Sequence, residues 1–278
     1  NIMSIDHYAV IGNPISHSKS PDIHQYFAKQ TGQSLSYKTI LAEKNDFKKM
    51  VDDFFMNQQG KGLNVTVPFK EDAWNLVDKK TQRAELAGAV NTIIPQRDGR
   101  LLGDNTDGIG LLNDLMKNYH LQIKQKNILL LGAGGAARGI IKPLLDAEPA
   151  LLIIANRTVS KAHQLARIFE SFGRLNACGF DELEHQSFDI IINATASSLN
   201  KQIPAIPAST ITNETVAYDL MYSKINTPFN QWCLDNGAKQ VFDGLGMLVE
   251  QAAEAFYLWR NVRPETHDVI EKLLQQSA

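Results

Sequence analysis

Polar and titratable side chains gather at the predicted ends of strands and in turns in the first third of the chain. Lys70 is the titratable group among them that could both move a proton and carry a positive charge. Such a set suits a small ligand with several hydroxyl groups. The small polar side chains at comparable positions are Ser16, Ser18, Asn64, Thr66, Asn91 and Asp107.

Each of these residues also has an ordinary structural explanation. Ser16 and Ser18 could form turns, and Asn91 could satisfy a buried backbone group. Asp107 could cap a helix, and most lysines, Lys70 included, are solvated. Their positions, where strands and turns would meet a cleft, favour contact with a ligand.

A glycine-rich stretch, NILLLGAGGAARG, organises the second half of the chain. Ile128–Leu131 form a short apolar run typical of a strand that is buried on both faces. Gly132, Gly134 and Ala137 then match the G-x-G-x-x-G/A pattern, which lets the backbone approach a pyrophosphate at the start of a helix. An ordinary strand-to-helix turn is the alternative, but the position between a buried strand and a helix favours dinucleotide binding.

The residues after the next strand indicate which dinucleotide is bound. Enzymes that prefer NAD usually carry an acidic residue about 20 positions beyond the glycines. Here Asn156, Arg157 and Thr158 occupy that place, and Lys161 follows. The Arg157 guanidinium could meet a 2′-phosphate, with Thr158 and Lys161 adding a hydroxyl and a second charge, which favours NADP. Alternatively, Asn156 caps the next helix and Arg157 is a solvated surface charge.

The elements that must position the first group of residues are strands and helices of a mixed α/β unit. Strands are expected at 7–12, 35–41 and 62–67, and a strand pair at 89–95 and 100–103 joined by Asp98-Gly99. Ser20 is expected to cap a helix to about residue 31. Asn45 is expected to cap a helix whose apolar residues belong to the core, and two short helices fill 71–86. Those core residues are Phe47, Met50, Val51, Phe54 and Phe55.

The second half alternates strands and helices, which implies a parallel sheet. Its strands are expected at 127–131, 151–155, 189–193 and 216–219, with a weaker candidate at 240–242. A helix over 108–118 precedes them, a long helix begins at Gly244, and a final helix follows Pro264.

We therefore predict two α/β domains. Residues 1–106 plus 244–278 form a substrate domain with a mixed sheet, to which the C-terminal helices return, and residues 107–243 form a Rossmann-type, doubly wound NADP-binding domain. A cleft between the domains is the expected place for a reaction.

Length, composition and net charge limit the kinds of partner that the chain is expected to bind. The chain has 278 residues, 44% hydrophobic content and a formal net charge of −2, with no long basic run, so nucleic acid and anionic membranes are not expected partners. No apolar run reaches the roughly 18 residues of a membrane helix, and no secretory signal is visible. Cys178 and Cys233 lie far apart and without metal-ligand spacing, so free thiols in the cytoplasm are expected, and no metal site.

Ten stretches, taken together and in this order, resemble the shikimate dehydrogenase family over the whole chain. Several are highly specific, and Lys161 is the one departure noted, because many relatives have arginine there. The stretches are GNPISHSKSP (12–21), NVTVPFK (64–70), GAVNT (88–92), GDNTDG (103–108), GAGGAARG (132–139), NRT (156–158), NATASSL (193–199), YDLMYS (218–223), TPF (227–229) and GLGMLVEQAA (244–253).

The resemblance implies an activity, namely reversible reduction of the C3 carbonyl of 3-dehydroshikimate to shikimate by NADPH. It implies that Lys70 and Asp107 lie beside the reacting oxygen. Our own hypothesis from the residue types is that Lys70 is the acid/base and Asp107 its orienting partner, and the sequence leaves open which of the two transfers the proton. The substrate carboxylate would be held by Ser16, Ser18 and Tyr222, and the ring hydroxyls by Asn64, Thr66, Asn91 and Gln251. The cofactor-binding residues implied are Gly132, Ala133, Gly134, Gly135, Ala136, Asn156, Arg157, Thr158, Lys161, Thr195, Met221 and Gly244.

Two other functions are compatible with the same motifs. One is an enzyme of the family that also oxidises quinate or uses NAD. The other is a non-catalytic NADP-binding sensor, which would not need to retain Lys70 and Asp107. Both a monomer and a homodimer are compatible with the sequence.

Overall fold

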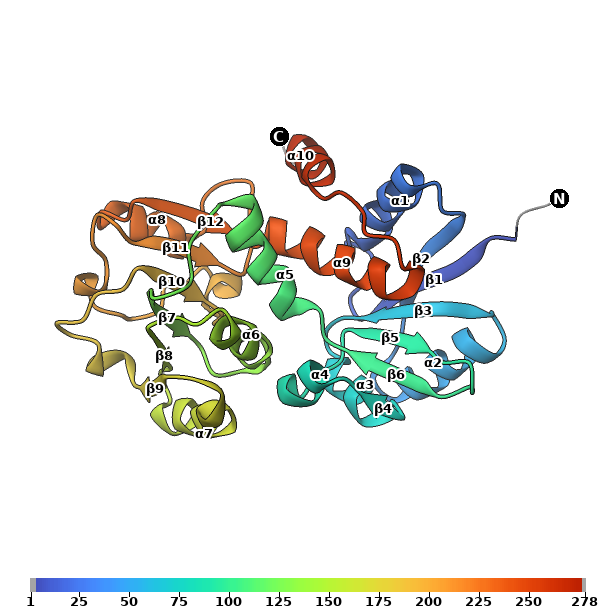
Figure 1. Cartoon of the computed structure of the whole chain (residues 1–278), viewed down its shortest axis with the longest axis horizontal. Helices are drawn as coiled ribbons and strands as arrows, with labels where there is room; N and C mark the ends of the chain where they lie inside the picture. Colours follow the sequence, from blue (N-terminus) through green and yellow to red (C-terminus); the bar gives the residue numbers. More distant parts are fainter. Residues whose placement is uncertain (1–3, 277–278) are drawn as a thin grey trace. The chain divides into compact units, whose positions relative to one another are not determined.

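A computed structural model describes residues 4–276 of the chain, and Figure 1 shows its elements. The chain divides into two compact units, of which the first comprises the residues up to Gly110 together with Val249–Gln276. The second unit comprises Leu111–Leu248. The boundaries fall inside helices α5 (Asp107–Asn113) and α9 (Leu245–Arg260). Residues 1–3 and 277–278, which the predicted substrate domain includes, lie outside the described residues.

The first unit is built on a six-stranded sheet in the order β2-β1-β3-β5-β6-β4, and the sheet is mixed, as predicted. β1 pairs in parallel with β2 and β3, whereas β5 runs antiparallel to both β3 and β6. The predicted turn at Asp98-Gly99 joins β5 to β6, and Gly99 has a φ of +84°, which favours glycine. The strands are β1 (Asp6–Gly12), β2 (Leu35–Leu41), β3 (Gly60–Val65), β4 (Lys79–Lys80), β5 (Thr92–Pro95) and β6 (Leu101–Asp104).

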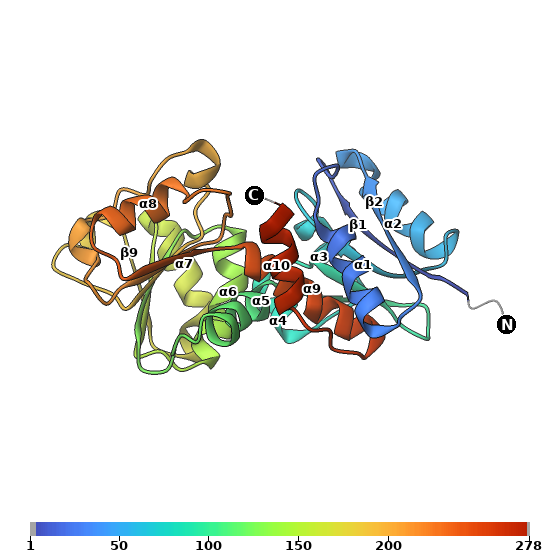
Figure 2. The ribbon, with the colours of Figure 1, turned by 90° about the horizontal axis from the view of Figure 1, so that it is seen from above.

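Helices cover both faces of this sheet because alternate strand residues point in opposite directions. Ala9 and Ile11 of β1 belong to the core cluster that contains Phe54 of α2 (Phe47–Met56). On the other face Tyr8 contacts Trp259 of α9, and α1 (Ser20–Thr31) packs there through Phe27 against Phe256. Figure 2 shows α1 and α2 on opposite sides of β1 and β2. The remaining helices of this unit are α3 (Lys70–Leu76), α4 (Gln82–Ala87) and α10 (His267–Gln276).

The second unit has an all-parallel six-stranded sheet in the order β12-β11-β10-β7-β8-β9, which is the Rossmann strand order and confirms the predicted fold class. The order reverses between β7 and β10, at the end where the glycine-rich loop follows β7. The strands are β7 (Asn127–Leu131), β8 (Leu151–Ala155), β9 (Leu175–Cys178), β10 (Ile190–Asn193), β11 (Val216–Asp219) and β12 (Gln240–Asp243). The helices between them include α6 (Gly135–Asp146), α7 (Val159–Phe169) and α8 (Pro228–Asp235).

Several element boundaries differ from the sequence predictions. β3 ends at Val65 rather than 67, because the chain turns before Pro68, which cannot donate to a ladder. Asn45 lies in a 3₁₀ turn, and α2 begins only at Phe47. Ser20 is the first helical residue of α1 and not its cap. The expected linker helix continues beyond α5 as a π-helical segment, Asp114–Asn118.

Two strands escaped prediction. β9 has four residues at the edge of its sheet without alternation of apolar and polar side chains, and β4 has two residues. The 3₁₀ helices of the chain are Lys44–Asp46, Glu170–Phe172, Phe180–Glu182, Ser197–Asn200 and Ala208–Thr210.

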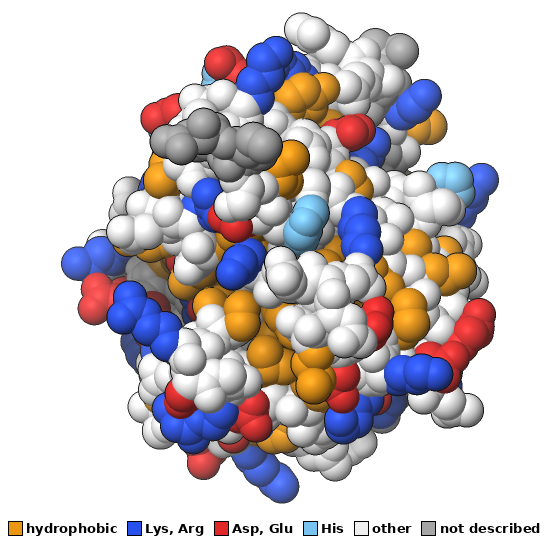
Figure 3. All heavy atoms as spheres, turned by 90° about the vertical axis from the view of Figure 1, so that its right-hand side faces the viewer, with side chains coloured by type: hydrophobic (Ala, Val, Ile, Leu, Met, Phe, Trp, Pro, Cys, Tyr) orange, Lys and Arg blue, Asp and Glu red, His pale blue; other side chains and the backbone are white. Residues whose placement is uncertain are grey.

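The surface carries both signs of charge. Figure 3 shows basic and acidic side chains interspersed on one face of the molecule, in keeping with the small net charge. Among residues 4–276, no helix has the length and apolar character needed to cross a membrane.

Candidate functional site

An ion pair joins the two residues that the motifs single out for chemistry. Lys70 begins α3 and Asp107 begins α5, and Lys70 Nζ lies 2.9 Å from Asp107 Oδ2. Both side chains are partly exposed, at 32% and 22%, so the pair can meet a ligand. The residues are 37 positions apart in the chain and are brought together by the fold.

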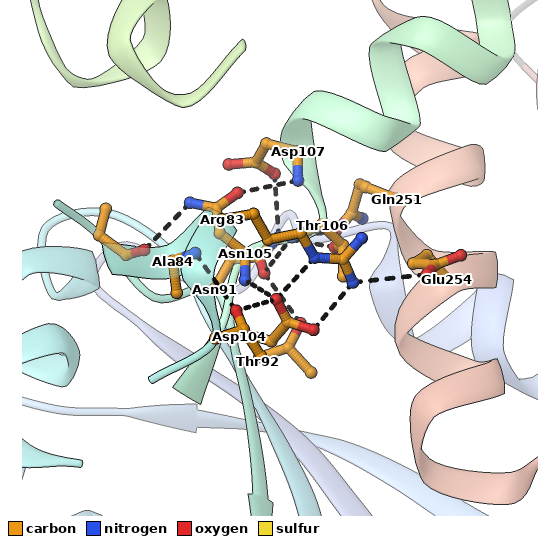
Figure 4. Close-up of polar contacts among 12 residues, drawn as sticks. Arg83, Ala84, Asn91, Thr92, Asp104, Asn105, Thr106, Asp107, Gln251 and Glu254 are labelled. Atoms are coloured by element: carbon orange, nitrogen blue, oxygen red, sulfur yellow. Dashed lines mark hydrogen bonds and ion pairs between the residues drawn. The ribbon is translucent and has the colours of Figure 1, made fainter. Parts of the chain in front are cut away.

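Asn91 connects this pair to helix α9 through hydrogen bonds. Its side-chain amide donates to Asp107 Oδ1 at 3.0 Å, to Thr106 Oγ1 at 2.9 Å and to Gln251 Oε1 at 3.4 Å. Its side-chain Oδ1 accepts from the backbone N–H of Thr106 and from the hydroxyl of Thr92. Figure 4 shows these side chains converging from β5, the β6–α5 turn and α9. The amide is therefore held in one orientation.

Asn64 extends the polar cluster on the neighbouring strand. It is buried in β3 opposite Thr92, and its amide donates to Thr92 Oγ1 and to the Asn91 carbonyl, each at 3.2 Å. Its Oδ1 accepts from the Tyr37 hydroxyl at 2.7 Å. Burial raises the pKa of Tyr37 well above its ordinary value, and a hydrogen bond with Ser20 opposes this only in part, so the hydroxyl remains a donor.

The two serines lie in the turn between β1 and α1. Ser18 Oγ accepts from the backbone N–H of Ser20, and the Ser18 N–H donates to the Ile15 carbonyl, which fits the role of a turn former. Ser16 is exposed. Thr66 lies just beyond β3, where a Cβ on Gly12 would overlap its methyl group, so only glycine fits at position 12.

The glycine-rich loop has the geometry that a pyrophosphate requires. Gly132 has a φ of +112°, and a Cβ there would lie 2.9 Å from the carbonyl oxygen of Ala194, so glycine is required on both grounds. A Cβ at Gly134 or Gly135 would meet no atom within 4 Å, which leaves open space above the loop. α6 begins at Gly135 and presents the free N–H groups of its first turn there.

Of the residues expected at the 2′-phosphate, Arg157 borders a cavity. A cavity of about 640 Å³ is lined by side chains that include Asn156, Arg157 and Thr195. Arg157, Thr158 and Lys161 are exposed, and the Asn156 amide donates to the Thr158 carbonyl at 3.1 Å. Asn156 therefore stabilises the turn and does not cap α7, whose cap position is Thr158. The open glycines after β7 and the exposed cations after β8 together fit NADP.

A buried carboxylate fixes the last group of expected cofactor residues. Asp219 accepts from the backbone N–H of Met221 at 3.1 Å and from Ser198 Oγ at 2.7 Å. The N–H of Gly244 donates to the Met221 carbonyl at 3.1 Å, and a Cβ at Gly244 would overlap the Leu220 carbonyl. The loop after β11 and the start of α9 are thus in close contact.

The structure brings together some predicted residues and adds others. Lys70, Asp107, Asn91, Gln251 and Asn64 form one hydrogen-bonded cluster in the first unit. Tyr222 belongs to the second unit, where it is exposed, and its role stays a prediction. No group of His, Cys, Asp or Glu between residues 4 and 276 is arranged to hold a metal ion. Sequence reasoning assigned no role to Tyr37, Arg83, Thr92, Asp104, Ser198 and Asp219. The last four lie inside the family-like stretches, which could have drawn attention to them, whereas Tyr37 and Arg83 lie outside every such stretch.

Comparisons with known protein families cover most of the chain. Residues 10–93 match the family model for the shikimate dehydrogenase substrate binding domain. Residues 114–214 match that for shikimate / quinate 5-dehydrogenase, and residues 244–274 match the shikimate 5′-dehydrogenase C-terminal domain.

Similar curated proteins match over nearly their full length. A shikimate dehydrogenase (NADP(+)) from Marinobacter nauticus is 56% identical over 274 residues, which is 98% of this chain and 99% of that protein. One from Hahella chejuensis is also 56% identical, with 98% and 99% covered.

Solved structures agree with this likeness. An Ael1 enzyme from Pseudomonas putida superposes with a TM-score of 0.93 at 46% identity, covering 96% of this chain and 98% of that one. A shikimate 5-dehydrogenase from Thermus thermophilus in complex with NADP(H) and shikimate has a TM-score of 0.85 at 30% identity, covering 99% and 100%.

Proposed function

The chain belongs to the shikimate dehydrogenase family of NADP-dependent oxidoreductases, and on that premise we propose that it interconverts 3-dehydroshikimate and shikimate with Lys70 as its acid/base. The observation that carries this proposal is the Lys70–Asp107 pair, 2.9 Å apart, inside a cluster of amide and hydroxyl groups. Relatives that match over nearly the whole of both chains are named shikimate dehydrogenase (NADP(+)). The polar cluster also supplies groups suited to a polyhydroxylated ring.

The reaction adds a hydride to a carbonyl carbon and a proton to its oxygen. NADPH, when bound, supplies the hydride. Negative charge develops on the substrate oxygen during this addition, and the Lys70 ammonium stabilises that charge before it donates the proton. In the reverse direction the neutral Lys70 amine takes the proton from the hydroxyl. Asp107 holds the Lys70 amino group in place through Oδ2, and its Oδ1 accepts a hydrogen bond from the Asn91 amide.

We assign the remaining polar residues of the first unit to the substrate. Asn64, Thr66, Asn91 and Gln251 bind ring hydroxyls, an assignment supported by the hydrogen bonds that fix both asparagine amides. The carboxylate is assigned to Ser16, Ser18 and Tyr222, following the family motifs.

The cofactor assignments follow from the second unit. The pyrophosphate is assigned to the loop of Gly132, Ala133, Gly134, Gly135 and Ala136, which is supported by the open space above two of its glycines. The 2′-phosphate is assigned to Arg157, Thr158 and Lys161, all of which are exposed. Arg157 shares its cavity with Asn156 and Thr195. Met221 and Gly244 are assigned to contacts near the nicotinamide.

We place the reaction in the cytoplasm, where both free cysteines remain thiols. Neither Cys178 nor Cys233 forms a disulfide. Burial raises the pKa of Cys233 to about 12 and that of Cys178 to about 11, so both are poor nucleophiles at neutral pH.

The test is formation of reduced nicotinamide by the purified protein in four mixtures, with shikimate or quinate and with NADP or NAD. The proposal predicts fast turnover with shikimate and NADP only. Comparable turnover with quinate or NAD would assign the chain to the broader branch of the family. Absence of turnover in all four mixtures, with NADP still bound, would favour the sensor.

A further inference from the structure

A second ion pair lies behind the Lys70–Asp107 pair. Asp104, the last residue of β6, has a side chain only 3% exposed that accepts two parallel hydrogen bonds from Arg83 of α4, from Nε at 2.7 Å and from Nη2 at 2.8 Å. The same carboxylate accepts from Thr81 Oγ1 at 2.6 Å and from the backbone N–H of Asn105 at 2.7 Å. This carboxylate is therefore fully engaged within the protein, and ligand binding does not account for it.

The Arg83–Asp104 ion pair holds in place the first residue of the turn that carries Asp107. Asp104 is three residues before Asp107, and each residue between them is held by a side chain. The Asp107 N–H donates to Asn105 Oδ1 at 3.0 Å, and the Asn105 amide donates to the Ala89 carbonyl at 3.1 Å. The Thr106 N–H donates to Asn91 Oδ1 at 2.9 Å. A shift of the Asp104 carboxylate would therefore move the whole turn.

Arg83 also contacts the helix that borders the site. Its Nη2 lies 3.4 Å from Glu254 Oε1 on α9, one turn beyond Gln251, which hydrogen-bonds to Asn91. α9 packs closely on α5 at this level, since a Cβ on Gly110 would lie 2.8 Å from the Cβ of Gln251. One guanidinium thus links the start of the turn to the helix against which α5, and hence Asp107, is placed (Figure 4).

We propose that Arg83 is a positioning residue for the reaction, because it holds Asp104 and Glu254 in the relation that keeps Asp107 on Lys70. This inference rests on the proposed function. Arginine is suited to the task because its planar fork can donate to two acceptors of one carboxylate and still reach a third oxygen, which a lysine ammonium on a flexible stem does not reproduce.

The test uses Arg83→Lys, with Arg263→Lys as the matched control. Arg263 also pairs with Glu254, at 3.0 Å, but it is half exposed and has no role in holding Asp104. For Arg83→Lys we expect kcat with shikimate and NADP to fall by about tenfold to a hundredfold, since a displacement of about 1 Å in a catalytic group costs that much. KM for NADP should change little, and Arg263→Lys should retain wild-type kcat.

To distinguish positioning of Asp107 from a purely structural role of Arg83, Arg83→Lys is repeated in an Asp107→Asn background. If Arg83 acts through Asp107, Arg83→Lys should lower kcat by less than about threefold in the Asp107→Asn background, because the effects of coupled residues are not additive. Rates are followed at stoichiometric enzyme concentration, so that slow variants remain measurable. Equal losses in both backgrounds, no loss in Arg83→Lys, or an equal loss in Arg263→Lys would overturn the proposal.

Two further outcomes are covered by the same design. If Arg83→Lys does not fold, Glu254→Gln tests the link on the α9 side, with a drop in kcat of about threefold expected, and an unchanged kcat refutes the proposal. Wild-type protein without turnover would refute the proposed function itself, which distinguishes that failure from a failure of Arg83 alone.

Discussion

His24 should make the first unit lose stability as the pH falls below neutral. Its imidazole is 1% exposed in α1, stacked on Tyr37 with ring centroids 4.3 Å apart and close to Trp259 at 5.4 Å. Its Nε2 is buried without a hydrogen-bond partner. Burial lowers the pKa of His24 from 6.5 to about 3, which a hydrogen bond with Asn64 offsets only in part.

The sign and size follow from proton linkage. In the folded protein His24 stays neutral down to about pH 3, whereas in the unfolded chain it takes up a proton below pH 6.5. The unfolded state therefore binds more protons between these limits, and stability falls as the pH falls through this window. Between pH 7 and pH 5 the contribution amounts to about 2 kcal/mol, and it is the same for any folded pKa below about 4.

The assay is urea unfolding at pH 7 and pH 5 for wild type and His24→Phe, which keeps an aromatic ring on Tyr37 and removes the titration. The wild type should lose about 2 kcal/mol more than the variant over this range. His267→Phe, at an exposed histidine, is the control and should follow the wild type. Equal losses in wild type and His24→Phe would refute the assignment of a neutral, buried imidazole.

The second unit offers further predictions. Gly244→Ala should destabilise the protein by about 1–3 kcal/mol in thermal or urea unfolding, because its Cβ overlaps the Leu220 carbonyl; unchanged stability would contradict this. Gly134→Ala should unfold like wild type, since its Cβ meets no atom within 4 Å, yet raise KM for NADP because the methyl group occupies the space assigned to the pyrophosphate; an unchanged KM would refute that assignment. Arg157→Met should raise KM for NADP about tenfold or more and leave KM for NAD unchanged, and equal changes for both would refute its role at the 2′-phosphate.

The sequence predicts those features that have a pattern of their own. The buried run before Gly132 and the glycine spacing predict β7, its loop and α6, and alternation of strands and helices predicts the parallel sheet. β9 was missed because four residues at a sheet edge show no period, and residues at the end of β3 were misplaced because alternation continued past its last residue.

The site was predictable as a set of residues but not as a network. Motifs single out Lys70, Asn91 and Asp107 for chemistry, whereas the ion pair between Asp104, inside the GDNTDG stretch, and Arg83, outside every motif, is visible only in the fold. No sequence pattern identifies Tyr37 either, because its role depends on a hydrogen bond to Asn64. Tyr37 is on β2 and Asn64 on β3, and β1 lies between these strands in the sheet.

The most direct test of the central claim is kcat of Lys70→Ala with shikimate and NADP, together with shikimate affinity from calorimetry. Lys79→Ala, at an exposed lysine of β4, is the control and should match the wild type. If Lys70 is the acid/base, its loss should lower kcat by about 10²–10⁴-fold while shikimate still binds. Nearly full turnover of Lys70→Ala with shikimate affinity intact would contradict the account.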